Sequence, residues 1–156
     1  MATDSLDLRD LPVSLKNNLG MLPTLLGYQL GTAKSIIIDS FSKTLSNKKL
    51  TPKLFGMLVV VESNSGVNQT VLSDLLNFDR AQTVRYLDRL QDQGLIRRTR
   101  DKKDRRNQII EIENKGKRLV ASLAKIVQIH ETKMTSNLSS RERATLMLLL
   151  QKLCSR

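Results

Sequence analysis

The sequence has 156 residues, of which 40% are hydrophobic and 26% charged, so it can form a packed core and is not wholly disordered. Lys and Arg number 26 against 15 Asp and Glu, a formal net charge of +11. No apolar run approaches the ~18 residues of a membrane span, and the single cysteine, Cys154, cannot form an internal disulfide. We therefore expect one cytoplasmic domain with helical extensions and no membrane segment.

Residues 80–118 carry most of the positive charge, with 13 Lys and Arg against 6 Asp and Glu. Residues 1–79 have equal numbers of basic and acidic side chains. A dense basic segment attracts polyanions, although charge alone does not distinguish nucleic acid from an anionic membrane or from a merely solvated surface. The local structure of this segment has to decide between them.

The first 50 residues predict an arm followed by one long helix. Pro12 and Pro23 interrupt residues 1–22, which leave room for one short helix from Ser14. Beyond Thr24, apolar residues recur at spacings of three and four, as on one face of a helix. They are Leu26, Leu30, Ala33, Ile37, Phe41 and Leu45, and the polar residues 46–49 end the helix.

Two shorter helices are predicted next. Thr51 is an N-cap before Pro52, whose missing N–H costs nothing at the first helical position. Asn68 can cap the second helix, and Asn77 tolerates the left-handed conformation of the tight turn after it. The buried face of the first helix is predicted to be Leu54, Met57, Leu58 and Val61.

A further helix is predicted between Asp79 and Gly94. Asp79 and Gln82 have the spacing of a capping box at its start, and Gly94 is a C-terminal cap at its end. Its inward residues are predicted to be Val84, Leu87 and Leu90.

The rest of the chain predicts a β-hairpin and two more helices. Residues 95–100 and 107–112 are strand candidates joined by the charged residues 101–106. Helices follow over 116–136 and 139–154, the second with a capping box of Ser139 and Glu142. Together with the helix at 24–46 they are more apolar than one lobe of about 60 residues could cover. Burial against a second copy would resolve this, so we expect a homodimer.

Residues 68–93 have the pattern of a helix-turn-helix, and the hairpin after them that of a wing. Arg85 and Arg89 are predicted to point outward from the last helix, with Gln82 and Tyr86 beside them. Two like charges at i and i+4 destabilise an isolated helix, whereas an anionic partner would reverse that effect. A helix fits the DNA major groove, where Arg can bind guanine and Gln can bind adenine.

The hairpin tip is strongly basic. A basic tip can place an arginine in the minor groove while the helix occupies the major groove, and Asp101 and Asp104 could hold neighbouring arginines in place. The alternative is a solvated charged turn with no partner. The basic residues are Arg97, Arg98, Arg100, Lys102, Lys103, Arg105 and Arg106.

The stretch from Gly66 to Ile96, together with the wing, resembles the multiple-antibiotic-resistance regulator (MarR) family. That family has the signature Asp-x-Arg, five residues, Leu-Thr, two residues, Gly, and Asp104, Arg106 and Gly116 match it in register. Ile112 stands for its Leu and Glu113 for its helix-capping Thr, so we expect Asn114 to cap here instead. The turn carries Asn77 where the family usually has Gly. The resemblance extends over residues 26–155.

The resemblance implies a mainly α fold with a small β-hairpin wing, a winged helix-turn-helix with N- and C-terminal dimerisation helices. The expected parts are an arm and dimerisation helix (1–50), a DNA-binding lobe (51–115) and C-terminal dimerisation helices (116–156). A homodimer would bind a pseudo-palindrome in double-stranded DNA, and Asp104 would brace the wing. The implied DNA-binding residues are Gln82, Thr83, Arg85, Tyr86, Arg89, Arg105 and Arg106.

Members of this family commonly release DNA when they bind small aromatic carboxylates or thioesters derived from them. The resemblance therefore implies a repressor with an effector pocket between the dimerisation helices and the lobe. Candidate lining residues are Tyr28, Ser35, Met57 and Val61. The alternative is a ligand-independent architectural or constitutive DNA-binding protein, and an RNA-binding winged helix is a more distant option.

The sequence offers no catalytic constellation and no cofactor motif, so we do not expect an enzyme. His130 lies on an apolar helix face with no second histidine, which favours a packed side chain over a metal ligand. Cys154, near the C-terminus, does not match the N-terminal sensing cysteine of peroxide-responsive members of the family.

Overall fold

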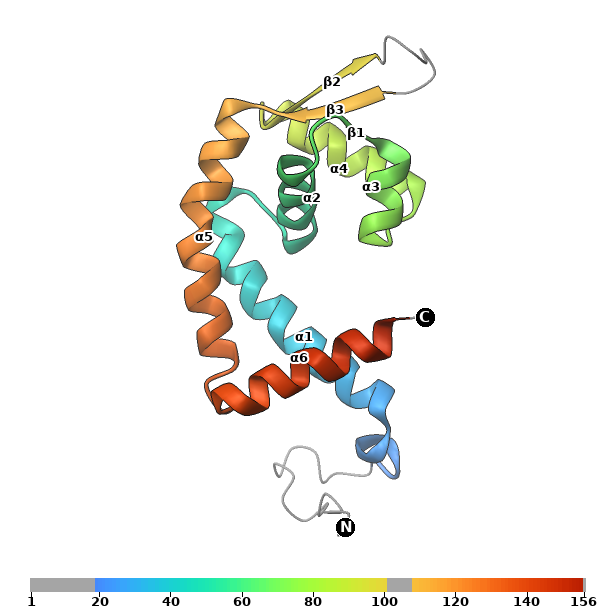
Figure 1. Cartoon of the computed structure of the whole chain (residues 1–156), viewed down its shortest axis with the longest axis vertical. Helices are drawn as coiled ribbons and strands as arrows, with labels where there is room; N and C mark the ends of the chain where they lie inside the picture. Colours follow the sequence, from blue (N-terminus) through green and yellow to red (C-terminus); the bar gives the residue numbers. More distant parts are fainter. Residues whose placement is uncertain (1–18, 101–107, 156) are drawn as a thin grey trace. The chain divides into compact units, whose positions relative to one another are not determined.

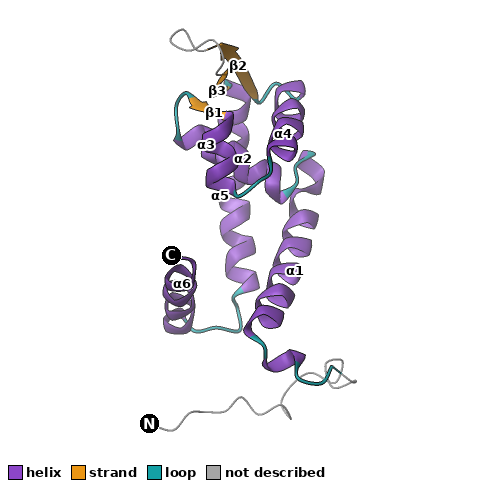
Figure 2. Ribbon diagram, turned by 90° about the vertical axis from the view of Figure 1, so that its right-hand side faces the viewer, coloured by secondary structure: helices purple, strands orange, loops and turns teal. Residues whose placement is uncertain are grey.

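The computed structural model describes residues 19–100 and 108–155. It divides into two compact units, Met1–Ser40 and Phe41–Arg156, and helix α1 begins in the first and ends in the second. The expected mainly helical fold with a small sheet is confirmed (Figure 1 and Figure 2). The elements in chain order are η3 (Leu22–Thr24), α1 (Leu26–Leu45), η4 (Ser46–Lys48), α2 (Pro52–Ser63), β1 (Val67–Asn68), α3 (Gln69–Leu76), α4 (Arg80–Asp92), β2 (Ile96–Arg100), β3 (Gln108–Ile112), α5 (Asn114–Met134) and α6 (Ser140–Cys154).

In the first unit, a short 3-10 turn precedes the long helix. Pro23 is buried in η3, and the Gln29 side-chain amide donates to its carbonyl at 2.6 Å. The apolar residues of α1 within this unit are exposed, among them Leu26, Ile36 and Ile37. The predicted short helix from Ser14 lies outside the described residues.

The second unit has its core around α2. Thr51 Oγ1 accepts a hydrogen bond from the Leu54 amide at 3.3 Å, with Pro52 in the first turn, so the predicted helix start is confirmed. The predicted buried face of α2 is also confirmed. The buried hydrophobic core consists of Leu45, Leu50, Leu54, Met57, Leu58, Val61, Val67, Leu72, Leu87, Leu90, Leu95, Ile96, Ile110 and Leu123.

The sheet has three antiparallel strands in the order β1–β3–β2. Strands β2 and β3 form the predicted hairpin, with Ile96 opposite Ile112 and Arg100 opposite Gln108. Strand β1 was not predicted, because two residues are too short for an alternating pattern. It pairs Val67 with Ile110 and so attaches the start of α3 to the sheet (Figure 1).

Helix α5 begins one residue earlier than the predicted cap allows. Its N-cap residue is Glu113, which makes no side-chain capping bond, so the prediction that Asn114 caps this helix is wrong. The Glu113 amide donates to the Leu95 carbonyl at 2.9 Å, which ties the residue before α5 to the residue before β2. A Cβ on Gly116 would lie 2.3 Å from that same oxygen, which explains why glycine stands here.

Helix α6 has the predicted capping box but none of the packing that α2 has. Ser139 Oγ accepts from the Glu142 amide, and Glu142 Oε2 accepts from the Ser139 amide at 2.8 Å. The hydrogen bonds from the Ser139 side chain and backbone hold the pKa of the Glu142 carboxyl below its usual value. None of residues 140–154 is buried, and Leu146, Leu149 and Leu153 are among its exposed side chains.

Candidate nucleic-acid interface

Helices α3 and α4 are joined by a short turn whose geometry is set by local hydrogen bonds. Asn68 Oδ1 accepts from the Val71 amide at 2.9 Å and starts α3. Asn77 ends it in the left-handed conformation (φ 50°), and the Phe78 amide donates back to the Ser73 carbonyl at 3.0 Å. Asp79 Oδ1 then accepts from the Gln82 amide at 2.7 Å and starts α4. These bonds build the predicted helix-turn-helix.

Helix α4 ends as its sequence predicts, although the cap residue is Gln93 and Gly94 follows it. Gly94 has a φ of 66°, in the left-handed region that favours glycine. Its amide donates to the Gln91 carbonyl, and the Leu95 amide donates to the Leu90 carbonyl at 2.9 Å. This is the paired pattern of a Schellman motif, and it directs the chain from α4 straight into β2.

The buried face of α4 is rotated by one residue from the prediction. Thr83 is fully buried with Leu87 and Leu90, whereas Val84 is 37% exposed. Thr83 Oγ1 accepts from Ser73 Oγ at 2.9 Å and donates to the Asp79 carbonyl at 3.0 Å. Because both hydrogen-bonding functions of this hydroxyl are satisfied, Thr83 can lie in the interface between α3 and α4. The prediction that Val84 points inward is therefore wrong. The DNA contact of Thr83 stays a prediction.

The outer face of α4 carries the two predicted arginines. At 100° per residue, Arg85 and Arg89 lie opposite the buried face, and both are exposed. Neither forms an ion pair with any residue in the described part of the chain. Gln82 lies one turn before Arg85 and is half-buried. The structure thus places Gln82, Arg85 and Arg89 on one side of the helix.

Tyr86 lies on the flank of α4 rather than on this outer face. Its ring packs against that of Phe78 with centroids 5.5 Å apart, and Lys53 lies 5.4 Å from the centroid of Phe78. Tyr86 is half-buried by this contact. It therefore supports the turn between α3 and α4.

Two arginines that sequence reasoning assigned to a free basic tip form ion pairs. Arg97 pairs with Glu111, its partner across the hairpin, at 2.8 Å. Arg98 pairs with Asp88 of α4 and also donates from Nε to Gln91 Oε1 at 2.6 Å. The hairpin register could have suggested the first pair, since opposite charges across two strands attract. No local signal predicts the second pair.

The centre of the wing falls in residues 101–107, outside the described residues. Asp101, Asp104, Arg105 and Arg106 belong to this segment. The brace by Asp104 and the DNA contacts of Arg105 and Arg106 stay predictions. Arg100, at the end of β2, is the last described residue before them, and it is exposed.

The residues proposed to line an effector pocket separate into two groups. Tyr28 is half-buried and Ser35 is exposed, both on the part of α1 in the first unit. Met57 and Val61 are 0% and 1% exposed and belong to the core of the second unit. Their assignment to a pocket, like that of Tyr28 and Ser35, stays a prediction.

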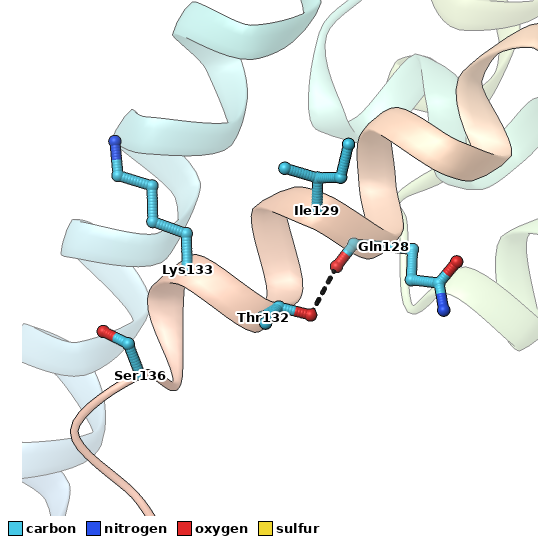
Figure 3. A pocket seen from close by; sticks show the side chains of 5 residues that line it. All are labelled: Gln128, Ile129, Thr132, Lys133 and Ser136. Atoms are coloured by element: carbon cyan, nitrogen blue, oxygen red, sulfur yellow. Dashed lines mark hydrogen bonds between the residues drawn. The ribbon is translucent and has the colours of Figure 1, made fainter.

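A shallow hollow of about 450 Å³ lies on the second half of α5, among residues that were not predicted to bind anything (Figure 3). Thr132 in its wall donates to the Gln128 carbonyl at 3.0 Å. A second hollow of about 310 Å³ lies on α6 beside Leu146 and Leu149. The first is lined by Gln128, Ile129, Thr132, Lys133 and Ser136.

His130 is packed in the second unit, where it is 6% exposed. Its ring lies 5.1 Å from that of Phe41, and Nδ1 is 3.9 Å from a carboxylate oxygen of Glu131. Within the described ranges, no three His, Cys, Asp or Glu side chains are grouped so that they could hold a metal ion. Over the same ranges, no helix is long and apolar enough to cross a membrane.

Comparison with known proteins identifies relatives that are transcriptional regulators. The model of the MarR family matches residues 49–107. A transcriptional regulatory protein assigned to the hcr operon of Thauera aromatica is 30% identical over 129 residues, covering 82% of this chain and 78% of that protein. The transcriptional repressor CouR, solved with a 23-mer DNA duplex, is 34% identical with a TM-score of 0.82, covering 86% of this chain and 95% of CouR.

More distant relatives share the fold. A mutant of MarR from E. coli, solved in complex with operator DNA, is 24% identical and superposes with a TM-score of 0.80. The alignment covers 86% of this chain and 97% of that one. These relatives are transcriptional regulators rather than enzymes.

Proposed function

Since this chain belongs to the MarR family of DNA-binding transcriptional regulators, we propose that it is a homodimeric repressor of a pseudo-palindromic operator, released by a small effector. The observation that carries the DNA-binding part is the outer face of α4. Arg85 and Arg89 are exposed there, and neither has an acidic partner among the described residues. Two adjacent like charges with no internal partner favour an anionic ligand on this face.

Helix α4 would lie in the major groove. Arg85 and Arg89 are one turn apart, about 6 Å along the helix axis, so they can reach neighbouring base pairs or phosphates. Gln82, one turn earlier, would contact a base near the start of the helix. The strands β2 and β3 would carry the wing toward the adjacent minor groove, where the contacts of Arg105 and Arg106 are proposed.

Two lobes would be joined through the terminal helices. Leu146, Leu149 and Leu153 of α6 are 42–59% exposed, which is unusual for side chains of this size along one stripe of a helix. Burying this stripe against a second copy would place two α4 helices about 34–36 Å apart, one turn of DNA. Binding to chromosomal DNA would also place the protein in the cytoplasm.

Release by a small effector is proposed because it is common in the family. The chemical class proposed is an aromatic carboxylate or a thioester derived from one. Tyr28, Ser35, Met57 and Val61 remain the proposed contacts, of which Met57 and Val61 would have to be reached through the core of the second unit. A constitutive DNA-binding protein would share every DNA contact described above and differ in showing no response to any such molecule.

The test is a selection of sheared genomic DNA from the source organism at about 0.2 M salt. We expect a few intergenic palindromes to be enriched by the wild type and lost by Arg85→Ala/Arg89→Ala. A Lys125→Ala/Lys133→Ala variant removes the same charge from exposed positions of α5 and should keep the enrichment. Uniform retention, or equal enrichment by the arginine variant, would contradict the proposed function.

Effector release is tested next on the selected operator. Aromatic carboxylates and their thioesters, chosen from the genes beside the operator, are titrated into the complex while fluorescence anisotropy follows the DNA. Release by one of them at constant salt supports the repressor, and no release by any of them favours the constitutive alternative.

A further inference from the structure

Arg98 connects the wing to the recognition helix. It lies in β2, yet it pairs with the Asp88 carboxylate and donates from Nε to Gln91 Oε1 at 2.6 Å, both on α4. Its side chain is 19% exposed, against 59% for the neighbouring Arg97. One guanidinium thus binds two acceptors that are three residues apart on one flank of α4.

The geometry of this contact fixes a direction as well as a distance. A guanidinium is planar, and two of its nitrogens donating to two acceptors define how β2 is oriented against α4. An ammonium group is a single point of charge and could not define that orientation. Strand β2 is also an edge strand, paired with β3 on one side. The position of β2 relative to α4 therefore depends on side-chain packing and on the contact of Arg98.

The contact also controls a negative charge close to the DNA-facing side. Asp88 lies three residues after Arg85 and directly before Arg89, and its side chain is 47% exposed. An unpaired carboxylate at this position would repel phosphate. The guanidinium of Arg98 neutralises it and directs it toward β2, so that the outer face of α4 remains basic.

Arg97 gives the matched comparison. It is adjacent in the same strand and carries the same charge, but its ion pairs within the described residues are with Glu111 at 2.8 Å and Glu113 at 3.8 Å. Those partners belong to the hairpin and to the residue before α5. Arg97 therefore braces the hairpin internally, whereas Arg98 braces it against α4.

We propose that Arg98, through Asp88 and Gln91, is a positioning residue that holds the wing at the angle to α4 at which both contact DNA together. The inference rests on the proposed DNA-binding function. Arg98 does not itself bind DNA in this account. Its removal leaves a lobe with a folded core whose wing and helix no longer engage the two grooves in register.

The experiment compares Arg98→Met with Arg97→Met, since both remove one positive charge from β2. Dissociation constants for the selected operator are measured by fluorescence anisotropy, contacts by hydroxyl-radical footprinting, and folding by circular dichroism. We expect Arg98→Met to weaken binding at least tenfold more than Arg97→Met. Its footprint should lose protection in the minor groove beside each half-site while the protection beneath α4 persists, a change that a loss of folded protein would not produce.

Two further variants separate geometry from charge. Arg98→Lys keeps the charge but loses the two-point contact, so it should remain at least threefold weaker than wild type. Adding Asp88→Asn to Arg98→Met should cost no further affinity and should restore part of it, because the contact is already broken and the unpaired carboxylate is removed. Gln91→Leu removes one acceptor of Arg98 without a change of charge. If Arg98→Met fails to fold, Gln91→Leu and Arg98→Lys together test whether the two-point contact positions the wing.

Wild-type affinity and footprint in both Arg98→Lys and Gln91→Leu would overturn the inference. So would equal losses in Arg98→Met and Arg97→Met. In either case the wild type would still select its operator, and the proposed function would stand. A wild type with no preference for any DNA sequence would instead overturn the proposed function, and this inference with it.

Discussion

Helices α2 and α6 carry similar apolar residues, but those of α2 are buried and those of α6 are exposed. In α2 the side chains of Leu54, Met57, Leu58 and Val61 are at most 1% exposed. In α6 the side chains of Leu146, Met147, Leu149 and Leu153 are 42–59% exposed. Both helices are capped by a hydroxyl side chain, Thr51 in one and Ser139 in the other, so local signals do not account for the difference.

The contrast indicates two sources of stability, burial of apolar side chains within one chain and burial of apolar side chains between two chains. Burying a large apolar side chain contributes about 1.5–3 kcal/mol. Helix α2 obtains this within its own chain, since it is surrounded by α3, α4, α5 and the sheet. Helix α6 can obtain it from a partner surface, and a contribution of that kind depends on protein concentration. The lobe is therefore expected to be stable by itself, and α6 to act in assembly.

The largest expected effect comes from charging α6. Leu146→Glu/Leu149→Glu should raise the dimer dissociation constant by at least about a thousandfold, because two carboxylates would be buried without partners at the proposed interface. Sedimentation velocity across a concentration series measures this. Leu75→Glu makes the same kind of change on the exposed face of α3 and should leave the dimer intact. A double variant that still dimerises like wild type would refute the assignment of α6.

Truncating a core side chain of the lobe should lower the free energy of unfolding at every protein concentration. Met57→Ala is expected to lower the free energy of unfolding by about 2–5 kcal/mol, since Met57 is fully buried. Urea denaturation at two protein concentrations should show the same loss at both. Leu146→Ala should show a loss that becomes smaller as the protein is diluted. If the two variants respond alike to dilution, the division between lobe and α6 is incorrect.

Adding a single methyl group at the start of α5 should destabilise the protein. Gly116→Ala is expected to cost about 1–3 kcal/mol, because its Cβ would meet the backbone oxygen of Leu95 at 2.3 Å and neither helix nor strand can easily move. At Gly56 in α2, by contrast, a Cβ would have no neighbouring atom within 4 Å. Gly56→Ala should therefore stabilise the protein by about 0.5–1 kcal/mol, and thermal melts compare the two. A loss in both would argue against the contact with Leu95.

The smallest expected effect is the pH dependence of the α6 cap. Hydrogen bonds from Ser139 lower the pKa of Glu142 in the folded protein, so its stabilisation is complete above the unfolded-state pKa and is lost as pH falls through the folded-state pKa. The melting temperatures of wild type and Glu142→Gln should differ near pH 7 and converge below the usual glutamate value of 4.5. A difference that stays constant down to pH 3 would exclude this origin.

The capping and turn features were predictable because each depends on residues close in sequence. Thr51 before Pro52, Asn77 in the left-handed turn and Ser139 with Glu142 all form bonds over three or four residues. Such spacings are visible in the sequence itself. They sufficed to predict the helix-turn-helix and the position of its outward arginines.

The features that were missed depend on distant partners. Thr83 is buried because Ser73, ten residues earlier, satisfies its hydroxyl, and periodicity alone cannot separate it from Val84 next to it. Arg98 is paired because β2 returns beside α4 and brings Asp88 into reach. The start of α5 is held by the bond from the Glu113 amide to the distant Leu95 carbonyl, and no side chain caps it. Each of these requires the three-dimensional arrangement.

Hydroxyl-radical footprinting of the wild-type protein on its selected operator tests the central claim most directly, that two joined lobes bind DNA through α4. We expect two protected half-sites with centres about 10–10.5 base pairs apart, both lost in Arg85→Ala/Arg89→Ala. A single protected site, continuous protection without that spacing, or an unchanged footprint in the arginine variant would contradict it.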